Sequence, residues 1–321
     1  MKIQEITVKE LDAKKFIEEK VGEISKAVGG GQVINALSGG VDSSAVTMVG
    51  HRALGENLKT YFINNGLMRK DEPLQIVSIF KKLGVKVEVV EAQDKFFKAL
   101  KGVTDPEEKR EAITQAFYKD VFGKLVKESG ARYLLQGTIL TDVDETVAGI
   151  KRQHNVFEQL GIDPEEAFGY KIIEPLVQLR KDGVRKVAQA AGLPDSIFNR
   201  MPFPGPALSA RVIGEATPEK ISLIRLATDI LETELANVKA FQYMAILHND
   251  RVTGIRNGKR DFGFQIEIRC WDSLDARSAK PTRLPYETLE KLADRMVNDV
   301  PGVVSVTYNI TCKPPSTMEA V

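Results

Sequence analysis

Cysteine and histidine are scarce in this sequence of 321 residues, which contains two cysteines and three histidines. Cys270 and Cys312 form no Cys-x-x-Cys motif, so neither a cysteine-rich zinc site nor a disulfide framework is expected. Both lie in segments with the composition of strands, which favours a structural role. A glutaminase that uses a cysteine nucleophile also needs a histidine base. If this protein consumes ammonia, we therefore expect another protein to generate it.

Long hydrophobic runs and an excess of one charge are also missing. No apolar run approaches the roughly 18 residues that cross a membrane, and the first residues lack the apolar core of a secretory signal. The 45 lysines and arginines nearly balance the 44 acidic residues, giving a net charge of +1. A dedicated nucleic-acid surface would be strongly basic. We expect a cytoplasmic protein that binds neither membranes nor nucleic acids.

The most informative feature that the sequence does contain is a short loop between a predicted strand and a predicted helix. Residues 32–37 are mostly apolar and have the length of a strand, and apolar residues with helical spacing follow the loop. The loop consists of Ser38, Gly39, Gly40, Val41, Asp42, Ser43 and Ser44. Glycines allow close approach of the backbone to a ligand, and a helix start presents unpaired N–H groups. The loop therefore suits a phosphate or pyrophosphate, and Asp42 offers an oxygen to an accompanying magnesium ion.

A simple helix cap formed by serine and aspartate is the alternative interpretation of this loop. Seven consecutive residues that are mostly small or polar, placed between two strongly patterned segments, favour phosphate binding. The loop matches neither the Walker motif G-x-x-x-x-G-K-[ST] nor the dinucleotide fingerprint G-x-G-x-x-G. It resembles instead the pyrophosphate loop of the N-type ATP pyrophosphatases. Those enzymes transfer AMP from ATP to a substrate oxygen and hold the departing pyrophosphate.

Strand-like and helix-like segments alternate from residue 32 to about residue 192, which predicts an α/β fold with a parallel sheet flanked by helices. Strands are expected at 32–37, 59–64, 85–90 and 131–136, and helices around 108–129 and 181–191. Ligands of such sheets bind beyond the carboxyl ends of the strands, where the loop 38–44 would lie. The connection 143–170 is polar and unusually long, which predicts a mobile lid or disorder.

The order of the elements changes after residue 200. Residues 201–207 carry three prolines and fit neither helix nor strand, so we place a domain boundary there, between an ATP-binding domain (1–200) and a smaller α+β domain (201–321). Thr217 and Pro218 supply the N-cap and first position of a long helix. Further strands are expected near 242–248, 262–270 and 303–310, with a helix at 286–299.

A series of short motifs, shared in order and spacing, resembles the ATP-pyrophosphatase part of the GMP synthetases. The likeness runs from about residue 15 to Glu319, without a glutaminase domain. Besides the loop, the motifs are Asn65–Arg69, Gly102–Glu107, Gln136–Thr138, Lys151 with His154–Val156, Glu174–Leu176, Lys181–Asp182, Pro202–Pro206 and Lys313–Pro315. The resemblance implies an adenine-nucleotide α-hydrolase-like fold followed by a domain that mediates homodimerisation and completes the nucleotide site.

The resemblance also implies a reaction, the ATP-dependent amination of xanthosine monophosphate (XMP) to GMP. ATP would bind the loop 38–44 together with Gly137 and Thr138, and Asp42 would help to hold Mg²⁺. The purine C2 oxygen of XMP would attack the α-phosphorus of ATP and release pyrophosphate. Ammonia from a separate glutamine amidotransferase subunit would then displace AMP.

Further site residues follow from the same family match. Lys151 and His154 lie in the predicted lid, would reach the reaction centre only after closure and, with Asp42, would form the catalytic set. Arg211, Lys313 and Glu319 resemble the contacts to the acceptor nucleotide, and Arg69 would face either the XMP phosphate or ATP. Asp142 follows a predicted strand at the ligand edge of the sheet and is also expected to bind substrate. Arginine suits a phosphate because its fork donates two parallel hydrogen bonds. The alternative for Arg69 and Lys151 is an ordinary solvated surface charge.

Two other functions remain open at the level of sequence. Residues 272–277 replace a family stretch that contains Asp-Phe-Met-Thr, and the ending after Glu319 lacks the usual Trp-Glu. A divergent relative that adenylylates a different acceptor is therefore one alternative. A non-catalytic nucleotide-binding regulator is the other, because the lid sequence 153–158 also departs from the family pattern. The intact loop 38–44, together with Lys151 and His154, speaks against a regulator.

Overall fold

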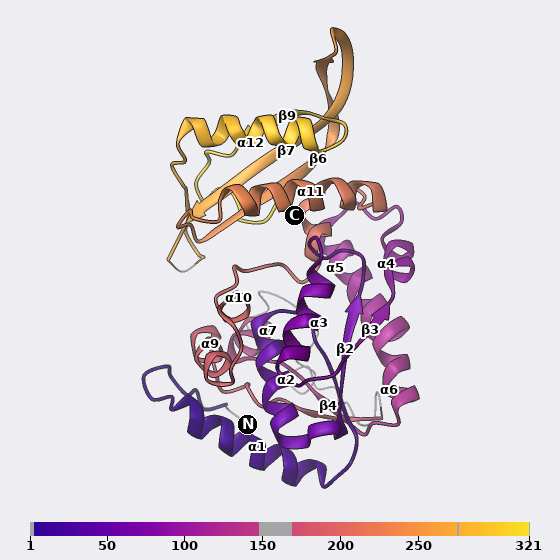
Figure 1. Cartoon of the computed structure of the whole chain (residues 1–321), viewed down its shortest axis with the longest axis vertical. Helices are drawn as coiled ribbons and strands as arrows, with labels where there is room; N and C mark the ends of the chain where they lie inside the picture. The colour runs from indigo at the N-terminus through magenta and orange to yellow at the C-terminus, as the bar shows by residue number, and fades with distance from the viewer. Residues whose placement is uncertain (1–2, 148–168, 275, 321) are drawn as a thin grey trace. The chain divides into compact units, whose positions relative to one another are not determined.

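The computed structural model describes residues 3–147, 169–274 and 276–320 (Figure 1). The chain divides into two compact units. Unit 1 comprises Met1–Asn64, Glu72–Glu91 and Phe117–Arg200, and unit 2 comprises Asn65–Asp71, Ala92–Ala116 and Met201–Val321. The last segment of unit 1 ends at Arg200, next to the proline-rich segment. Two segments that come before it in the sequence, Asn65–Asp71 and Ala92–Ala116, nevertheless belong to unit 2. No helix in the described ranges is long and apolar enough to cross a membrane.

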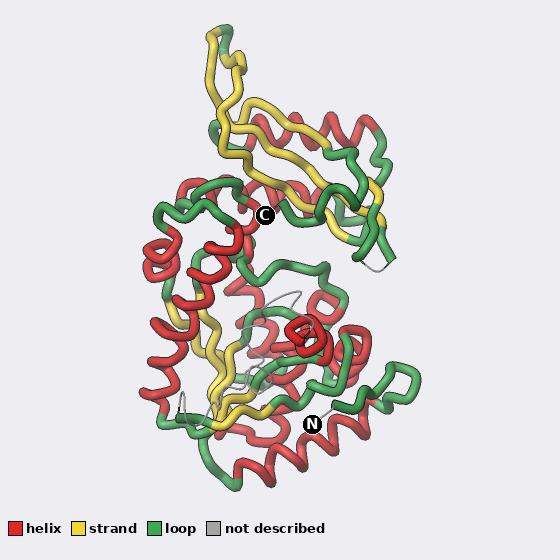
Figure 2. Tube along the Cα trace, turned by 180° about the vertical axis from the view of Figure 1, so that it is seen from behind, coloured by secondary structure: helices red, strands yellow, loops and turns green. Residues whose placement is uncertain are grey.

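Unit 1 is built on a parallel sheet of five strands in the order β3-β2-β1-β4-β5. The strands are β1 (Val33–Ala36), β2 (Leu58–Asn64), β3 (Val87–Glu91), β4 (Tyr133–Leu135) and β5 (Lys171–Ile173). Figure 2 shows these strands flanked by helices, which confirms the predicted α/β class. Val33, Ile34 and Phe62 are fully buried, as expected for central strands covered on both faces.

Within the described part of the chain, unit 1 contains seven α-helices. They are α1 (Ala13–Val28), α2 (Val41–Leu54), α3 (Glu72–Lys82), α6 (Gly123–Ser129), α7 (Leu140–Val147), α9 (Lys181–Ala190) and α10 (Asp195–Phe198), with a 3-10 turn at Gly55–Asn57 and a π-helical segment at Ala116–Phe122. Asp12 caps α1 by accepting hydrogen bonds from the N–H groups of Lys14 and Lys15. Helix α1 packs against α2 and α9.

Unit 2 combines helices with a second, mixed sheet. Its helices are α4 (Gln93–Leu100), α5 (Pro106–Gln115), α11 (Pro218–Glu234) and α12 (Tyr286–Asp299), with a 3-10 segment at Ala207–Arg211. Its strands are β6 (Gln242–Arg256), β7 (Lys259–Asp272), β8 (Lys280–Pro281) and β9 (Val303–Tyr308). Strand β7 pairs antiparallel with β6 and β8 and parallel with β9. The predicted α+β character is confirmed, and α12 has the predicted bounds.

In unit 2 the predicted helix start at Thr217 is confirmed, whereas the strands predicted at 242–248 and 262–270 are longer in the structure. Thr217 caps α11, since its hydroxyl accepts from the N–H of Lys220 at 3.2 Å. The hairpin of β6 and β7 extends well beyond the expected strands and turns at Asn257 and Gly258, both with positive φ (Figure 2). An Asn-Gly pair with positive φ at both residues is typical of a tight hairpin turn.

The predicted lid is described only at its two ends. Residues 143–147 continue α7 rather than a loop, and Gly169 and Tyr170 precede β5. Residues 148–168 lie outside the described residues, and so do the predicted catalytic residues Lys151 and His154.

Candidate active site

The loop 38–44 joins the carboxyl end of β1 to the start of α2, as the sequence predicts. Gly40 is the N-cap of α2, and Asp42 lies in its first turn. Gly39 has a φ of 79°, and a Cβ there would come within 3.0 Å of Ile76. Both facts require glycine at position 39. The first turn of α2 leaves N–H groups without an intrahelical acceptor, a feature that favours binding of an anion.

Serine hydroxyls hold the loop in a compact shape. The hydroxyls of Ser38 and Ser43 lie 2.9 Å apart, and the N–H of Ser38 donates to Ser43 Oγ at 3.2 Å. The N–H of Gly40 donates to Ser38 Oγ at 3.3 Å. The hydroxyl of Ser44 is buried and has no hydrogen-bond partner within the described part of the chain. Hydroxyls of this kind can rotate to donate to a bound phosphate.

The segment after β4 lies against the start of α2. A Cβ on Gly137 would lie 3.2 Å from backbone atoms of Asp42 and Ser43, closer than most Cβ atoms come to backbone, so glycine favours this close approach. Thr138 is fully buried, and its hydroxyl donates to the carboxylate of Glu174 while accepting from Gln136 Nε2 at 3.1 Å. Gly137 is therefore adjacent to the loop. Thr138 is the next residue in the chain, and its hydrogen bonds to Gln136 and Glu174 hold it in place.

Asp42 places its two carboxylate oxygens in different surroundings. Its Oδ2 accepts from Lys181 Nζ, the first residue of α9, at 2.6 Å. Its Oδ1 is buried and has no hydrogen-bond partner among the residues described here. A buried oxygen without a partner is costly, and a cation would satisfy it.

Lys181 is a site residue to which the sequence analysis gave no role. A lysine at the first position of a helix is disfavoured by the positive end of the helix dipole. That local conflict, together with the family motif Lys181–Asp182, was the available signal. Its ammonium group adds positive charge next to the start of α2, where an anion is expected to bind.

Arg200 is a second contact that the sequence did not reveal. Its Nη1 donates to the carbonyl oxygen of Gly39 at 3.1 Å, and its Nη2 pairs with Glu72 of α3. The side chain of Glu72 is only 5% exposed. The three residues are far apart in the sequence, so no spacing pattern connects them. Their contacts fix the orientation of the Gly39 peptide group within the loop.

Most of the predicted acceptor residues belong to unit 2, where Arg69 and Arg211 lie against Phe203 and Glu319 lies near Arg211. The guanidinium carbons of Arg69 and Arg211 lie 3.9 and 4.7 Å from the centre of the Phe203 ring. Arg211 is almost fully buried, and its Nε lies 3.8 Å from Oε2 of Glu319. Gln242 donates to Oε1 of Glu319 at 2.9 Å. This cluster offers cations for a phosphate and a carboxylate for ring N–H groups.

The other two predicted acceptor residues make different contacts. Lys313 donates through Nζ to the carbonyl oxygen of Ala276 at 2.7 Å. Asp142, in unit 1, accepts from the N–H of Ile139 at 3.1 Å and so caps the start of α7. Gln242 was missed by the sequence analysis, because a buried polar residue at the start of a strand has no motif of its own.

In the described part of the chain, Asp42 is the candidate ligand for a metal ion. Within the described ranges, no three His, Cys, Asp or Glu residues cluster as metal ligands. A magnesium ion bound by few carboxylates and by substrate phosphates does not need such a cluster.

Cys270 does not have the properties of a catalytic nucleophile. Its thiol is buried, which raises its pKa and so disfavours the reactive thiolate.

Two family models match this chain. The model described as GMP synthase C terminal domain matches residues 229–320, and the model described as Asparagine synthase matches residues 26–253. Curated proteins that are named as one subunit of glutamine-hydrolyzing GMP synthase match nearly the whole chain. The one from Pyrococcus furiosus is 46% identical over 308 residues, which cover 95% of this chain and 96% of that protein. The one from Archaeoglobus fulgidus is 44% identical over 309 residues, which cover 96% of this chain and 99% of that protein.

Proposed function

The chain belongs to this family of GMP synthase subunits, and from that premise we propose that it converts XMP to GMP with ATP as the energy source. The observation that carries the proposal is the anion site at residues 38–44, at the start of α2. It suits the triphosphate of ATP, and the N-type ATP pyrophosphatases carry such a loop. The name of the relatives includes glutamine hydrolysis and describes one subunit of an enzyme, which supports a separate partner subunit.

In the first step, the chain's residues favour loss of pyrophosphate from ATP. The C2 oxygen of XMP forms a bond to the α-phosphorus, and the bond from that phosphorus to the β-phosphate oxygen breaks. The N–H groups at the start of α2, the hydroxyls of Ser38, Ser43 and Ser44, and the ammonium of Lys181 offset the charge that builds on pyrophosphate. Gly137 and Thr138 complete the ATP contacts. No side chain needs to be modified.

In the second step, ammonia attacks C2 of the adenylylated XMP. The bond between C2 and the oxygen breaks, so AMP leaves with that oxygen, and one proton is released as the amino group of GMP forms. We assign Lys151 and His154, which lie outside the described residues, to this reaction centre on the family resemblance alone. Asp42 completes the proposed catalytic set.

Asp42 also fits the magnesium ion that accompanies ATP. Its buried Oδ1 has no hydrogen-bond partner in the described ranges, and would hold the ion together with phosphate oxygens. When bound, the ion neutralises phosphate charge. Lys181 keeps Oδ2 in place and so directs Oδ1 inward.

We assign XMP to Arg69, Asp142, Arg211, Lys313 and Glu319. The two arginines suit its phosphate, and the Glu319 carboxylate suits N–H groups of the purine ring. We further propose that the protein acts as a homodimer through residues 201–321, works in the cytoplasm, and receives ammonia from a separate glutamine amidotransferase subunit.

The test is product analysis with the purified full chain. With ATP, magnesium chloride, XMP and ammonium chloride, we expect equal amounts of AMP and GMP, measured by chromatography. With glutamine replacing ammonium, no GMP should form. ATP turnover only with a different acceptor would favour a divergent relative, and ATP binding without turnover of any acceptor would favour a regulator.

A further inference from the structure

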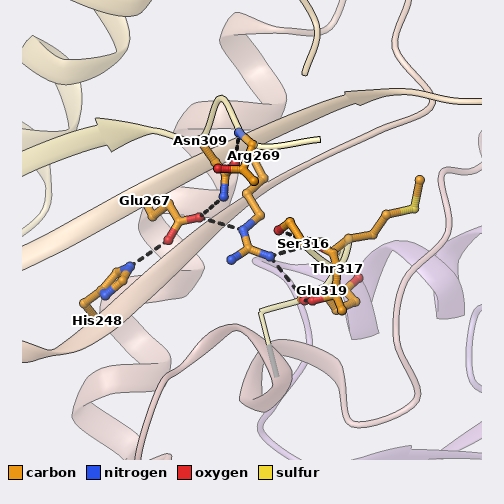
Figure 3. A network of polar contacts seen from close by, with 9 residues as sticks. His248, Glu267, Arg269, Asn309, Ser316, Thr317 and Glu319 are labelled. Atoms are coloured by element: carbon orange, nitrogen blue, oxygen red, sulfur yellow. Dashed lines mark hydrogen bonds and ion pairs between the residues drawn. The ribbon is translucent and has the colours of Figure 1, made fainter. Parts of the chain in front are cut away.

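Glu267, in β7, is the centre of a polar network on the sheet of unit 2 (Figure 3). Its Oε1 accepts from Arg269 Nε at 2.6 Å and from Asn309 Nδ2 at 3.0 Å. Its Oε2 lies 2.8 Å from His248 Nε2. The carboxylate therefore has hydrogen-bond partners on both oxygens, and its side chain is only 13% exposed.

Glu267 is held in its charged form. Burial by itself raises the pKa of this carboxyl, but the hydrogen bonds from His248, Asn309 and Arg269 outweigh burial and lower the pKa to about 2. Glu267 thus remains an anion at any pH near neutrality. It offers Arg269 a permanent ionic partner that fixes the Nε side of the guanidinium.

The other side of the Arg269 guanidinium points to the segment around Glu319 (Figure 3). Its Nη1 donates to the carbonyl oxygen of Thr317 at 2.8 Å, and lies 3.3 and 3.2 Å from those of Met318 and Glu319. Three successive carbonyl groups therefore converge on one nitrogen. This geometry fixes the backbone at Thr317–Glu319.

The segment 309–320 depends on such contacts because it forms no helix or strand of its own. Met318 packs into a small cluster with Trp271 and Ala279. The carboxylate of Glu319 accepts from Gln242, and Arg211 lies within ion-pair distance. The position of that carboxylate is therefore set by Gln242 of β6, by Arg211 and by the Arg269 contacts.

We propose that Glu267 is a positioning residue for the acceptor nucleotide: by orienting Arg269 it fixes the backbone of Thr317–Glu319 and so presents the Glu319 carboxylate to XMP. This inference rests on the proposed function of Glu319 as an XMP contact. Glu267 itself does not touch the substrate. His248 and Asn309 act one step further away, by orienting Glu267.

The test compares Glu267→Ala with Glu267→Gln in the full-length protein, with ammonium as the nitrogen source. Glu267→Ala removes the partner of Arg269, so we expect the KM for XMP to rise about tenfold, while kcat and the KM for ATP stay within about twofold. Amide hydrogen exchange at residues 316–320 should become faster. Glu267→Gln should stay within about threefold of wild type. Its oxygen can accept from Arg269 and Asn309, while its amide donates to neutral His248.

Glu234→Ala is the matched control. Glu234 lies in α11 of the same unit, has a similarly buried carboxylate, and pairs with Lys291 and Arg295 of α12 at 2.6 and 2.9 Å. We expect this variant to lose stability without a change in the KM for XMP or in exchange at 316–320. If Glu267→Ala proves insoluble, Arg269→Lys replaces it, because a single ammonium group cannot bind Glu267 and three carbonyls at once.

The outcomes separate this proposal from the proposed function. Unchanged KM for XMP and unchanged exchange at 316–320 in Glu267→Ala would overturn the positioning role. An equal rise in the KM values for XMP and ATP, or the same effect in Glu234→Ala, would overturn it too, since both indicate general loss of structure. If the wild-type protein forms no GMP, the proposed function fails and Glu267 has no role in XMP binding. Hydrogen exchange at 316–320 would still test whether Glu267 and Arg269 fix the backbone of Thr317–Glu319.

Discussion

At the scale of single residues, the two carboxylate oxygens of Asp42 differ in their contacts. One carboxylate oxygen accepts from Lys181, and the other is buried with no hydrogen-bond partner in the part of the chain described here. An ordinary helix cap would direct its oxygen to an N–H of its own helix. The geometry at Asp42 therefore favours the phosphate site over the simple cap that the sequence left open.

We expect Asp42→Asn to lower AMP and GMP formation at least about 100-fold, because the amide keeps the shape but removes the charge. The fold should be unchanged by circular dichroism and thermal melting. Asp12→Asn is the control, because Asp12 only caps α1 and should affect activity little. Full activity in Asp42→Asn would show that the assignment is wrong.

Arg200 provides a second prediction at this scale, since it joins the loop to Glu72. Arg200→Met should raise the KM for ATP about tenfold through loss of the bond to Gly39. It should also lower the free energy of unfolding by roughly 2 to 3 kcal/mol, because Glu72 loses its arginine. Adding Glu72→Gln should restore stability but not the KM for ATP. Recovery of both by the double variant would mean that Arg200 acts on the fold alone.

At the scale of elements, the sequence predicted those with strong local signals. Helix α12 has an apolar face at helical spacing, and Thr217 and Pro218 mark the start of α11, so both were found. Strand β5 was missed because its three residues are too few to show a pattern. The outer part of the β6–β7 hairpin was missed because its residues are largely exposed and do not alternate.

A segment predicted as one helix can contain helical turns of different hydrogen-bond spacing. The pattern over 108–129 indicated one helix, but the structure has α5, a π-helical segment and α6 in succession. A four-residue apolar spacing does not distinguish these forms. In the candidate site, the loop 38–44 was predictable because its residues are contiguous, whereas Arg200 and Gln242 act through contacts between distant segments.

Helix α5 is tied to the segment 207–212 by a buried lysine. Lys109 is 1% exposed, and its Nζ donates to the carbonyl oxygen of Val212 at 2.7 Å and lies 3.4 Å from that of Ser209. Burial, with a smaller effect of nearby Lys220, lowers its pKa to about 8, although Asp105 acts in the opposite direction. The contact supports the backbone at Arg211, which the sequence assigns to the acceptor nucleotide.

This lysine predicts a pH dependence of stability. Between pH 8 and pH 10.5 the unfolded chain binds more protons at Lys109 than the folded chain, so stability rises with pH. Relative to Lys109→Met, the free energy of unfolding of the wild-type protein should rise by up to about 3 kcal/mol across that range. Below pH 8 the difference should be constant. Urea unfolding at pH 7.5 and pH 10 measures it, and the same difference at both values would contradict the account.

At the scale of the whole molecule, the sequence predicted a boundary near residue 200 but did not indicate which segments make up each compact unit. Residues 65–71 and 92–116 belong to unit 2, although the chain returns to unit 1 after each of these segments. Hydrophobic periodicity shows which face of a helix is buried, but it does not identify the partner. The family resemblance predicted Arg69 and Arg211 as substrate contacts, but hydrophobic periodicity gave no sign that both would lie against Phe203.

The proposed reaction determines where the C2 oxygen of XMP ends up. If the C2 oxygen of XMP attacks the α-phosphorus of ATP, it must leave with AMP when ammonia displaces it. The direct test uses XMP labelled with ¹⁸O at C2, together with ATP, magnesium and ammonium, and mass spectrometry of the products. The account predicts one labelled oxygen in the phosphate of AMP and none in pyrophosphate. Unlabelled AMP, or label in pyrophosphate, would contradict it.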